Sequence, residues 1–449
     1  MEPVSPVAEY RRAALLFTDQ NESGTSAGGA RSRMMERPMR SFFAAAACLL
    51  LPILSCREEG DPGPSFSRRD SAGVVVVENL SPAWSEREPW QVPTVPTFDL
   101  SGWTDPELWL PRDARVLPDG RLALFNPGSC EIRFYESEGG FESASGGCGG
   151  GPGEYSHGYG SLFPWRGDSL LVFDYAQRRA TIVDGSGVLG RTERVPNHAD
   201  IPRPWIRGVL AEGTVILYGE REPVLESGPG VAQGELSVGI LKSFQDSVQL
   251  VGIFPGREFE YWVDPGRRGR RRLAFGYTTE FVNGPDRLYV GFQDRYEIRV
   301  FKGDGAPERV IRRQYSRMQV TQEDWDRILE DLLSTTEDPE RRRALRQGLR
   351  DRPFAPVMPA FGTTVWPGNP GIRPGMVADE VGNLWVRDYY RPGEYANRWS
   401  VFSAEGVWLG TVSLPDHFHP TQIGPDFLLG EMVGDLGVRH IRRFPLIKP

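Results

Sequence analysis

The chain has 449 residues, of which 25% are charged and 39% hydrophobic, and its formal net charge is −8. This is the composition of a folded globular protein, and the negative charge argues against a nucleic-acid-binding role. Glycine (52 residues), proline (38 residues) and aromatic residues (11%) are all plentiful. Such a mixture is typical of many short strands joined by tight turns, so we expect an all-β protein.

The first element along the chain is an export signal. A short basic segment at 35–40 precedes an apolar run at 41–55, which is shorter than the roughly 20 residues of a membrane-spanning helix. The run ends in Ser55 and Cys56. This order resembles the lipobox of bacterial lipoproteins, which implies cleavage before Cys56, acylation of its thiol and attachment to a membrane of the bacterial cell envelope. An ordinary signal peptide with an incidental cysteine is the alternative.

These features set the expected domain boundaries. Residues 1–55 are predicted to be a leader with the lipoprotein signal peptide, and the true start is expected near 34–39 because acidic residues precede the basic segment. Residues 56–70 are polar with proline and glycine, which predicts a flexible tether. Residues 71–449 are predicted to form the folded body.

One pattern recurs six times in the predicted body. Each copy has a glycine turn, a short apolar strand, a polar break and a second strand, and the copies begin near Leu117, Arg166, Ala211, Gly284, Glu380 and Gly424. A strand-bearing period of about 40–50 residues is typical of propeller blades. A β-sandwich also has many short strands, but it would not repeat one pattern six times. We therefore predict a six-bladed β-propeller.

The predicted ring needs a closing strand. The sixth copy ends after two strands, whereas the early segments 73–78 and 95–100 have no blade of their own. Either segment could pair with the last blade and so remove an exposed sheet edge.

A small helical hairpin is predicted at about 320–352, inside the propeller. Thr321 and Asp324 form a variant of the capping box, and apolar residues from Trp325 onward follow helical spacing. Pro339 suits the first position of a second helix. The hairpin is expected to pack on the propeller rim, and a lid or docking element is the alternative.

Two sequence features resemble a known family. They are the D-G-x-L pattern at 119–122 and the sequence GGGPGEY at 149–155. Together they resemble six-bladed β-propeller lipoproteins related to NHL-repeat and TolB-like propellers, over residues 71–449. The resemblance implies a fold and a compartment, but it implies no particular reaction.

Carboxylates and histidines are the candidate ligand-binding groups. Glu154, Asp174 and Asp388 fall at the ends or openings of predicted blade strands, and such oxygens bind calcium in the lactonase-like propellers that this chain resembles in fold. His417 and His419 stand two apart, as zinc ligands on one strand face would. Two ligands are too few for a zinc site, and the surrounding sequence predicts a turn. No cofactor is predicted, and calcium or zinc is the alternative.

Two further features concern cysteine and charge. Cys130 and Cys148 flank a predicted hairpin, so in an oxidising compartment they are expected to form a disulfide. The basic run 266–272 is predicted to be a solvated loop, and contact with an anionic lipid or cell-wall polymer is the alternative.

No catalytic residues are predicted, because the sequence has no nucleophile elbow and no Walker or Rossmann glycine motif. We expect a binding scaffold for an envelope protein, a glycan or a small molecule. The alternative is a metal-dependent hydrolase of the lactonase type.

Overall fold

The computed structural model describes residues 65–449, except 85–87, 102–103, 106, 159, 224–227, 265–266, 335, 351, 363–374, 395–396 and 435–437. The predicted leader and Cys56 lie outside the described residues. The described strands form six sheets, which are numbered here in chain order.

The first three sheets are built only from consecutive strands. The first contains β4 (Arg112–Val116), β5 (Leu122–Asn126), β6 (Glu131–Tyr135) and β7 (Phe141–Gly146). The second contains β8 (Gly160–Pro164), β9 (Leu170–Asp174), β10 (Arg179–Val183) and β11 (Leu189–Arg194). The third contains β12 (Trp205–Val209), β13 (Val215–Arg221), β14 (Gly230–Leu241), β15 (Gln249–Asp264) and β16 (Arg267–Arg272).

The fourth and sixth sheets also take in strands from near the N-terminus. The fourth contains β17 (Thr279–Asn283), β18 (Arg287–Phe292), β19 (Glu297–Lys302) and β20 (Pro307–Arg313), together with β2 (Val74–Asn79) and β1 (Phe66–Ser71). The fifth contains β21 (Met376–Ala378), β22 (Leu384–Arg387), β23 (Arg398–Phe402) and β24 (Trp408–Ser413). The sixth contains β25 (Phe418–Ile423), β26 (Phe427–Val433), β27 (Arg439–Pro445) and β3 (Phe98–Ser101).

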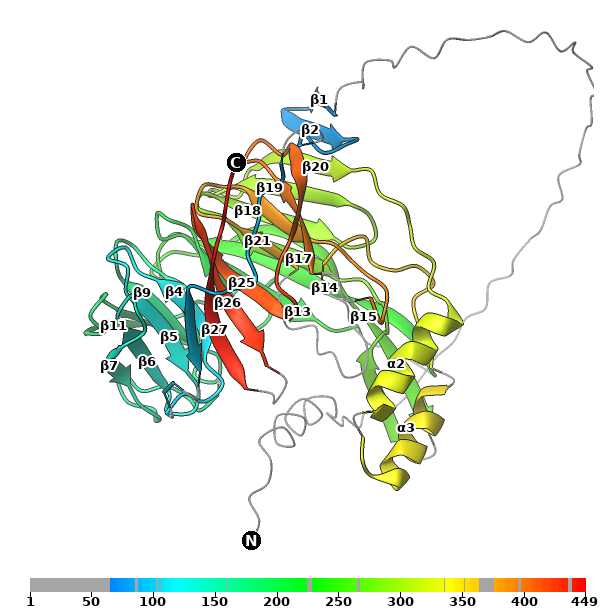
Figure 1. Ribbon diagram of the computed structural model, residues 1–449, viewed down its shortest axis with the longest axis horizontal. Helices are drawn as coiled ribbons and strands as arrows, with labels where there is room; N and C mark the ends of the chain where they lie inside the picture. Colours follow the sequence, from blue (N-terminus) through cyan, green and yellow to red (C-terminus); the bar gives the residue numbers. More distant parts are fainter. Residues whose placement is uncertain are drawn as a thin grey trace, which may run out of the picture.

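The sheets form a closed ring around their first strands. Strands β4, β8, β12, β17, β21 and β25 contact one another in that order, and β25 contacts β4 again. Sheets that radiate from a ring of inner strands define a β-propeller, so the predicted all-β propeller class is confirmed. The sheets are seen in Figure 1, where the first two lie at the end opposite the helices.

The repeated pattern supplies the second and third strands of each sheet. Strands β5 and β9 are buried along their whole length, because both of their faces pack against neighbouring sheets. This explains why these strands read as short apolar runs in the sequence.

The strand β3 closes the ring. It pairs antiparallel with β27, so of the two predicted closing segments it is 95–100 that completes the sixth sheet. The other segment forms β2, which pairs in parallel with β20 of the fourth sheet, and β1 then pairs antiparallel with β2. The ordered body thus begins by Phe66, and not at residue 71 as the predicted tether boundary implied.

The segment between β2 and β3 crosses the outer edge of the fifth sheet. The N–H groups of Ala83 and Trp84 donate to the carbonyls of Trp408 and Leu409, at 2.9 and 2.8 Å. A Cβ at Gly410 would lie 2.2 Å from the Trp84 ring, so this close approach requires glycine. Residues 66–101 therefore join the fourth, fifth and sixth sheets, and we call this segment the N-terminal strap.

The predicted helical hairpin is present as α2 (Gln322–Ser334) and α3 (Pro339–Arg350). Thr321 caps α2 reciprocally: its N–H donates to Asp324 Oδ2 at 2.8 Å, and the Asp324 N–H donates back to Thr321 Oγ1 at 3.3 Å. Trp325 and Ile328 are buried in a cluster with residues 273–275, which follow β16. This packing supports the rim position, and Figure 1 shows both helices at one end of the propeller. Neither described helix is long and apolar enough to cross a membrane.

Candidate functional site

Two of the predicted ligand-binding carboxylates stabilise loops. The Glu154 carboxylate accepts a 2.7 Å hydrogen bond from the Gly151 N–H, inside the glycine-rich GGGPGEY segment. Asp174 is fully buried and accepts hydrogen bonds from the N–H groups of Ser156 and Gln177, at 2.7 and 2.8 Å. The glycine-rich segment is thereby held against the end of β9, so it connects the first and second sheets.

The third predicted carboxylate belongs to a different part of the ring. Asp388 Oδ1 accepts from Arg313 at 3.1 Å and from the Ser400 hydroxyl at 2.7 Å, at the junction of the fourth and fifth sheets. The Arg313 guanidinium also lies 3.9 Å from the ring centre of Trp408. Asp388 thus holds two sheets together and does not share a site with Glu154 and Asp174.

The predicted histidine pair lies at the start of the sixth sheet. His417 has a positive φ of 61° in the turn before β25, and His419 is in β25 itself. In the described part of the chain, the one set of three metal-ligating groups within reach of a single ion does not include this pair.

That set consists of Cys130, Cys148 and His157, whose ligand atoms lie within 4.8 Å of one another. The two cysteines form the predicted disulfide, with a Cα–Cα distance of 4.9 Å. His157 Nδ1 lies 4.0 Å from each sulfur, and its ring stacks on Trp109. Cysteine binds metals as a thiolate, so with the disulfide formed these residues are no metal site.

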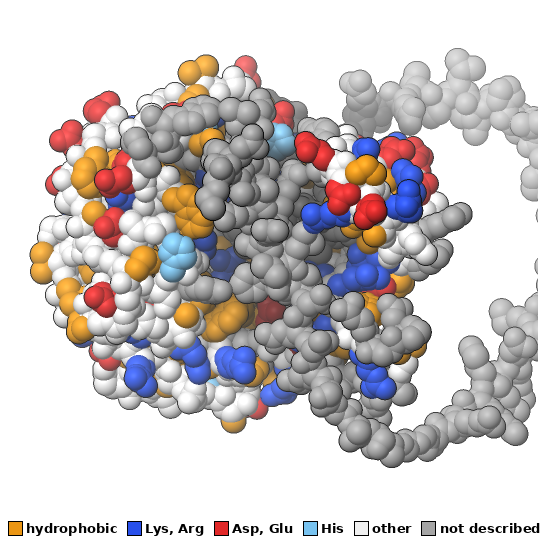
Figure 2. All heavy atoms as spheres, turned by 90° about the horizontal axis from the view of Figure 1, so that it is seen from below, with side chains coloured by type: hydrophobic (Ala, Val, Ile, Leu, Met, Phe, Trp, Pro, Cys, Tyr) orange, Lys and Arg blue, Asp and Glu red, His pale blue; other side chains and the backbone are white. Residues whose placement is uncertain are grey.

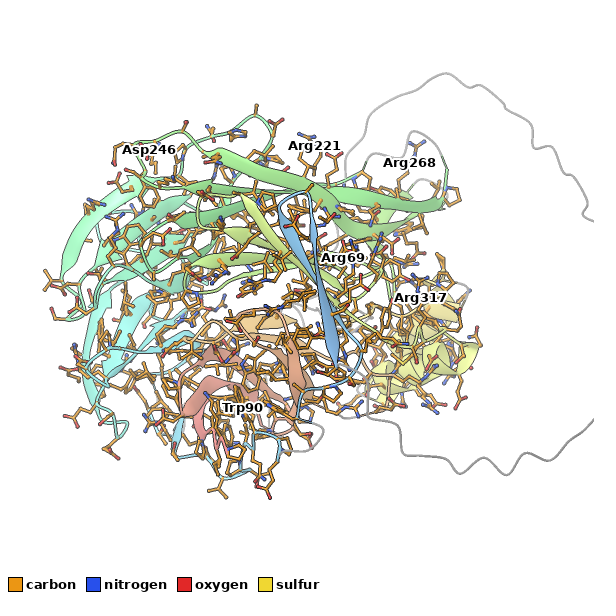
Figure 3. All side chains as sticks on the ribbon, turned by 90° about the horizontal axis from the view of Figure 1, so that it is seen from above. Arg69, Trp90, Arg221, Asp246, Arg268 and Arg317 are labelled. Carbon is orange, nitrogen blue, oxygen red and sulfur yellow. A yellow bond between two sulfur atoms is a disulfide. The ribbon has the colours of Figure 1, made fainter. Side chains whose placement is uncertain are left out.

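The basic run at 266–272 was predicted to be a solvated loop, but its described residues from Arg267 onward form strand β16. Arg270 pairs with Glu222, and Arg271 Nε lies 2.7 Å from Glu260 Oε2. Burial lowers the pKa of Arg272 to about 10, with a smaller effect from the charge of Arg257. Arg268 remains exposed at the edge of the molecule (Figure 3). Most of the run therefore serves folding and does not form a free basic patch.

A cavity of about 650 Å³ lies where the strap meets the fourth sheet. Its charged walls are already paired, since Arg312 contacts Glu78 at 3.1 Å and Glu297 at 2.9 Å. Acidic and basic side chains are interspersed on the face of the helical end that Figure 2 shows. Two buried atoms of the cavity, Arg313 Nε and Tyr296 Oη, have no hydrogen-bond partner, but Arg313 is paired with Asp388 at 3.1 Å, so the cavity offers no unpaired charge among its described residues.

Three of the inner strands at the ring centre carry irregularities. The pairing register shifts between Arg112 and Arg115 in β4, between Ile206 and Gly208 in β12, and between Pro420 and Gln422 in β25. Asp113, within the first shift, has a positive φ of 54°. Bulges of this kind redirect side chains and are frequent beside functional sites.

Three arginines lie on these irregular strands, and we call Arg112, Arg115 and Arg207 the arginine cluster. The Nε atoms of Arg112 and Arg115 are buried and have no hydrogen-bond partner among the described residues. Arg115 donates to the Thr421 carbonyl at 2.5 Å. Arg207 makes no hydrogen bond or ion pair with another described residue, although it lies 5.9 Å from the ring centre of Phe281.

The three arginines lie on β4 and β12, which both contact β8, and their charges act on common neighbours. Burial lowers the pKa of Arg115; the charges of Asp113 and Glu380 counteract this effect, and that of Arg207 adds to it. Burial likewise raises the pKa of Tyr175, where the Ser161 hydrogen bond and the charges of Arg207 and Arg112 act in the opposite direction. The Tyr175 hydroxyl donates to Ser161 Oγ at 3.0 Å.

Aromatic rings line the adjoining strands. Tyr175, Trp205 and Tyr218 follow one another edge to face, with ring centres 5.5 and 5.8 Å apart, and we call them the aromatic arc. Trp205 is 40% exposed, so the arc can be reached from solvent. The arc and the arginine cluster together can bind a molecule that has both a charged group and an apolar face.

Neither the arginine cluster nor the aromatic arc was predicted from the sequence. The signal was present, since Arg112–Val116 and Trp205–Val209 each place arginine inside a strand that packs at the centre of the fold. A buried charge in a core strand is rare unless it is paired or functional. Without the strand order, however, these positions cannot be assigned to the inner edge of a sheet.

No protein-family model matches the chain, and no curated protein sequence matches it. The chain is similar to a solved structure from Bacteroides fragilis of a protein described as exported, with 10% identity, a TM-score of 0.42 and coverage of 83% of this chain and 100% of that one. It is also similar to virginiamycin B lyase from Staphylococcus aureus (11% identity, TM-score 0.36, coverage 80% and 100%). A third similar structure is a gluconolactonase from Xanthomonas campestris, with 14% identity, a TM-score of 0.37 and coverage of 85% of this chain and 100% of that one. Likenesses at this level carry no argument about function.

Proposed function

We propose that the protein is a six-bladed propeller lipoprotein of the bacterial cell envelope, which binds a small molecule or glycan at the ring centre. Its anchor would be a lipid on Cys56, and the described body would face away from the membrane. The observation that carries the binding role is the arginine cluster, in which Arg112, with a buried Nε, and Arg207 have no hydrogen-bond or ion-pair partner among the described residues. Buried donors of this kind are costly unless a ligand or water completes them.

A metal-dependent hydrolase would need converging carboxylates. The three predicted carboxylates instead have structural partners. Glu154 accepts from Gly151 in a loop, Asp174 accepts from Gln177 in a turn, and Asp388 pairs with Arg313. These roles favour the scaffold over the lactonase-like alternative. A relation to NHL-repeat or TolB-like propellers remains part of the proposal, resting on the repeat pattern.

The test uses residues 65–449, which contain every strand of the six sheets. A panel of sugars, sugar acids and cell-wall fragments is screened by thermal shift, and ligands found in this way are measured by calorimetry. Arg207→Gln and Trp205→Ala should weaken binding at least tenfold, while Arg191→Gln on the exposed outer strand β11 should not. A ligand that binds all four proteins equally would contradict the assignment, as would binding that requires added calcium.

A further inference from the structure

The ring centre also indicates what kind of ligand it binds, an inference that rests on the proposed function. We infer that the ligand is an acidic sugar, whose carboxylate is held by the arginine cluster and whose ring face lies on the aromatic arc. Two independent features carry this inference: the lack of an ion-pair partner for Arg112 and Arg207 among the described residues, and the exposed ring of Trp205.

The unpaired guanidinium groups favour an anion. Neither Arg112 nor Arg207 makes a side-chain hydrogen bond or an ion pair with another described residue. The carboxylates of this region already accept hydrogen bonds: Asp113 from the Leu162 N–H at 3.3 Å, Glu380 from the Gln422 amide at 2.6 Å, and Glu280 of the inner strand β17 from the Gly375 N–H at 3.4 Å. The two arginines therefore remain available for a negatively charged ligand.

The third sheet does not supply the missing negative charge to Arg207. Burial raises the pKa of Tyr218; the charge of Glu220 adds to this effect, and the charge of Arg207 opposes it. Glu220, however, is already paired with Arg257 at 3.2 Å. Arg207 is thus left with only its ring contact to Phe281 among the described residues. A guanidinium binds a carboxylate through two parallel N–H donors, and such charge-assisted bonds are roughly twice as strong as neutral ones.

The aromatic arc defines the rest of the ligand. Trp205 is 40% exposed and is held edge to face between Tyr175 and Tyr218, which fixes its ring plane. A rigid, exposed ring binds the apolar face of a cyclic molecule with little loss of conformational entropy. A sugar acid has such a face together with a carboxylate, whereas a simple anion has no group to place on Trp205.

The test compares trigalacturonate with its fully methyl-esterified form, because esterification removes the charge and keeps the rings. Calorimetry on residues 65–449 should show binding of the acid, at least tenfold weaker binding of the ester, and an affinity for the acid that falls as NaCl rises. Arg207→Gln and Arg112→Gln should each weaken binding of the acid at least tenfold, and Arg207→Lys should give an intermediate loss. Arg191→Gln serves as the matched control, and thermal melts check that each variant is folded.

The possible contrary results distinguish a wrong ligand class from a wrong binding site. If the ester binds as tightly as the acid, and Trp205→Ala weakens both, the anionic class is wrong while binding at the ring centre stands. If neither compound binds, the acidic-sugar inference is overturned, and the panel of sugars and cell-wall fragments still decides the proposed function. If Arg207→Gln binds the acid as the wild type does, both the inference and the location of the site are wrong.

Discussion

The N–H of Trp408 donates a 2.7 Å hydrogen bond to the side-chain oxygen of Asn79, a residue 329 positions earlier in the chain. The Asn79 amide group in turn donates to the carbonyls of Arg312 and Gly406, at 2.9 and 3.0 Å. One buried side chain of the N-terminal strap therefore joins the fourth and fifth sheets of the propeller. The strap is part of the fold and not a simple extension of the tether.

The first prediction concerns this contact. Asn79→Ala leaves an N–H and two carbonyls without their partner in a buried place, so we expect the free energy of unfolding to fall by about 3 kcal/mol. Urea denaturation of residues 65–449 measures this change. Asn197→Ala, at an exposed position, should change it by less than about 0.5 kcal/mol. Equal stability of the two variants would show that the strap does not hold the sheets together.

The second prediction concerns pH. Glu260 is buried between Arg271 and Arg352; burial alone would raise its pKa, but the two arginines lower it below its ordinary value of 4.5. A lowered folded-state pKa stabilises the protein above the unfolded-state value, and this contribution is lost as the pH falls through the folded-state pKa. Glu260→Gln should therefore destabilise the protein by about 3 kcal/mol at pH 7, and the difference from wild type should shrink below about pH 4.5.

Denaturation curves at pH 7 and at acidic pH measure this difference. Glu235→Gln removes the partner of Arg221 in an exposed ion pair and is the matched control, with little expected effect at either pH. A stability difference for Glu260→Gln that stays constant with pH would mean that this carboxylate is not charged when folded.

The third prediction concerns the disulfide between Cys130 and Cys148, which closes a loop with a sequence separation of 18. Replacing both cysteines with serine should lower the free energy of unfolding by roughly 3 kcal/mol, because the unfolded chain gains freedom. Reducing the wild type should lower its melting temperature to a similar extent and leave the double variant unchanged. A wild type that melts at the same temperature with and without reductant would contradict a stabilising role.

The fourth prediction concerns the anchor, which lies outside the described residues. When the full chain is produced in a bacterial host, the wild type should partition with membranes and carry the added mass of a lipid. Cys56→Ser should remove the lipid mass, whereas Cys48→Ser, within the apolar run, should keep it. Identical masses and fractionation for the wild type and Cys56→Ser would rule out the lipid anchor.

Local sequence signals predicted most of the fold. The spacing of the turns predicted the strand pairs, and the capping pattern at Thr321 predicted the start of α2, because turns and helix caps depend on residues only a few positions apart. The parallel pairing of β2 with β20 could not be predicted, since it joins segments more than 200 residues apart. The prediction of a loop for the basic run was wrong because its arginines are paired within the third sheet, Arg270 with Glu222 after β13 and Arg271 with Glu260 in β15, and a run of like charges gives no sign of these partners.

The site was harder to predict than the fold. Asp174 and Asp388 have the right chemistry for ligand binding, but their partners within the fold use that chemistry for turns and ion pairs. Arg207 was overlooked because a lone arginine in a short strand has no motif around it. What distinguishes it is the lack of an ion-pair partner among the described residues, which no sequence pattern records.

The most direct test of the ring-centre site is a crystal structure of residues 65–449 grown with trigalacturonate. We expect a sugar carboxylate within hydrogen-bond distance of Arg207 or Arg112, with a sugar ring over Trp205. Sugar bound only elsewhere, for example in the cavity beside Glu78 and Arg312, or a ring centre left empty at saturating concentrations, would contradict it.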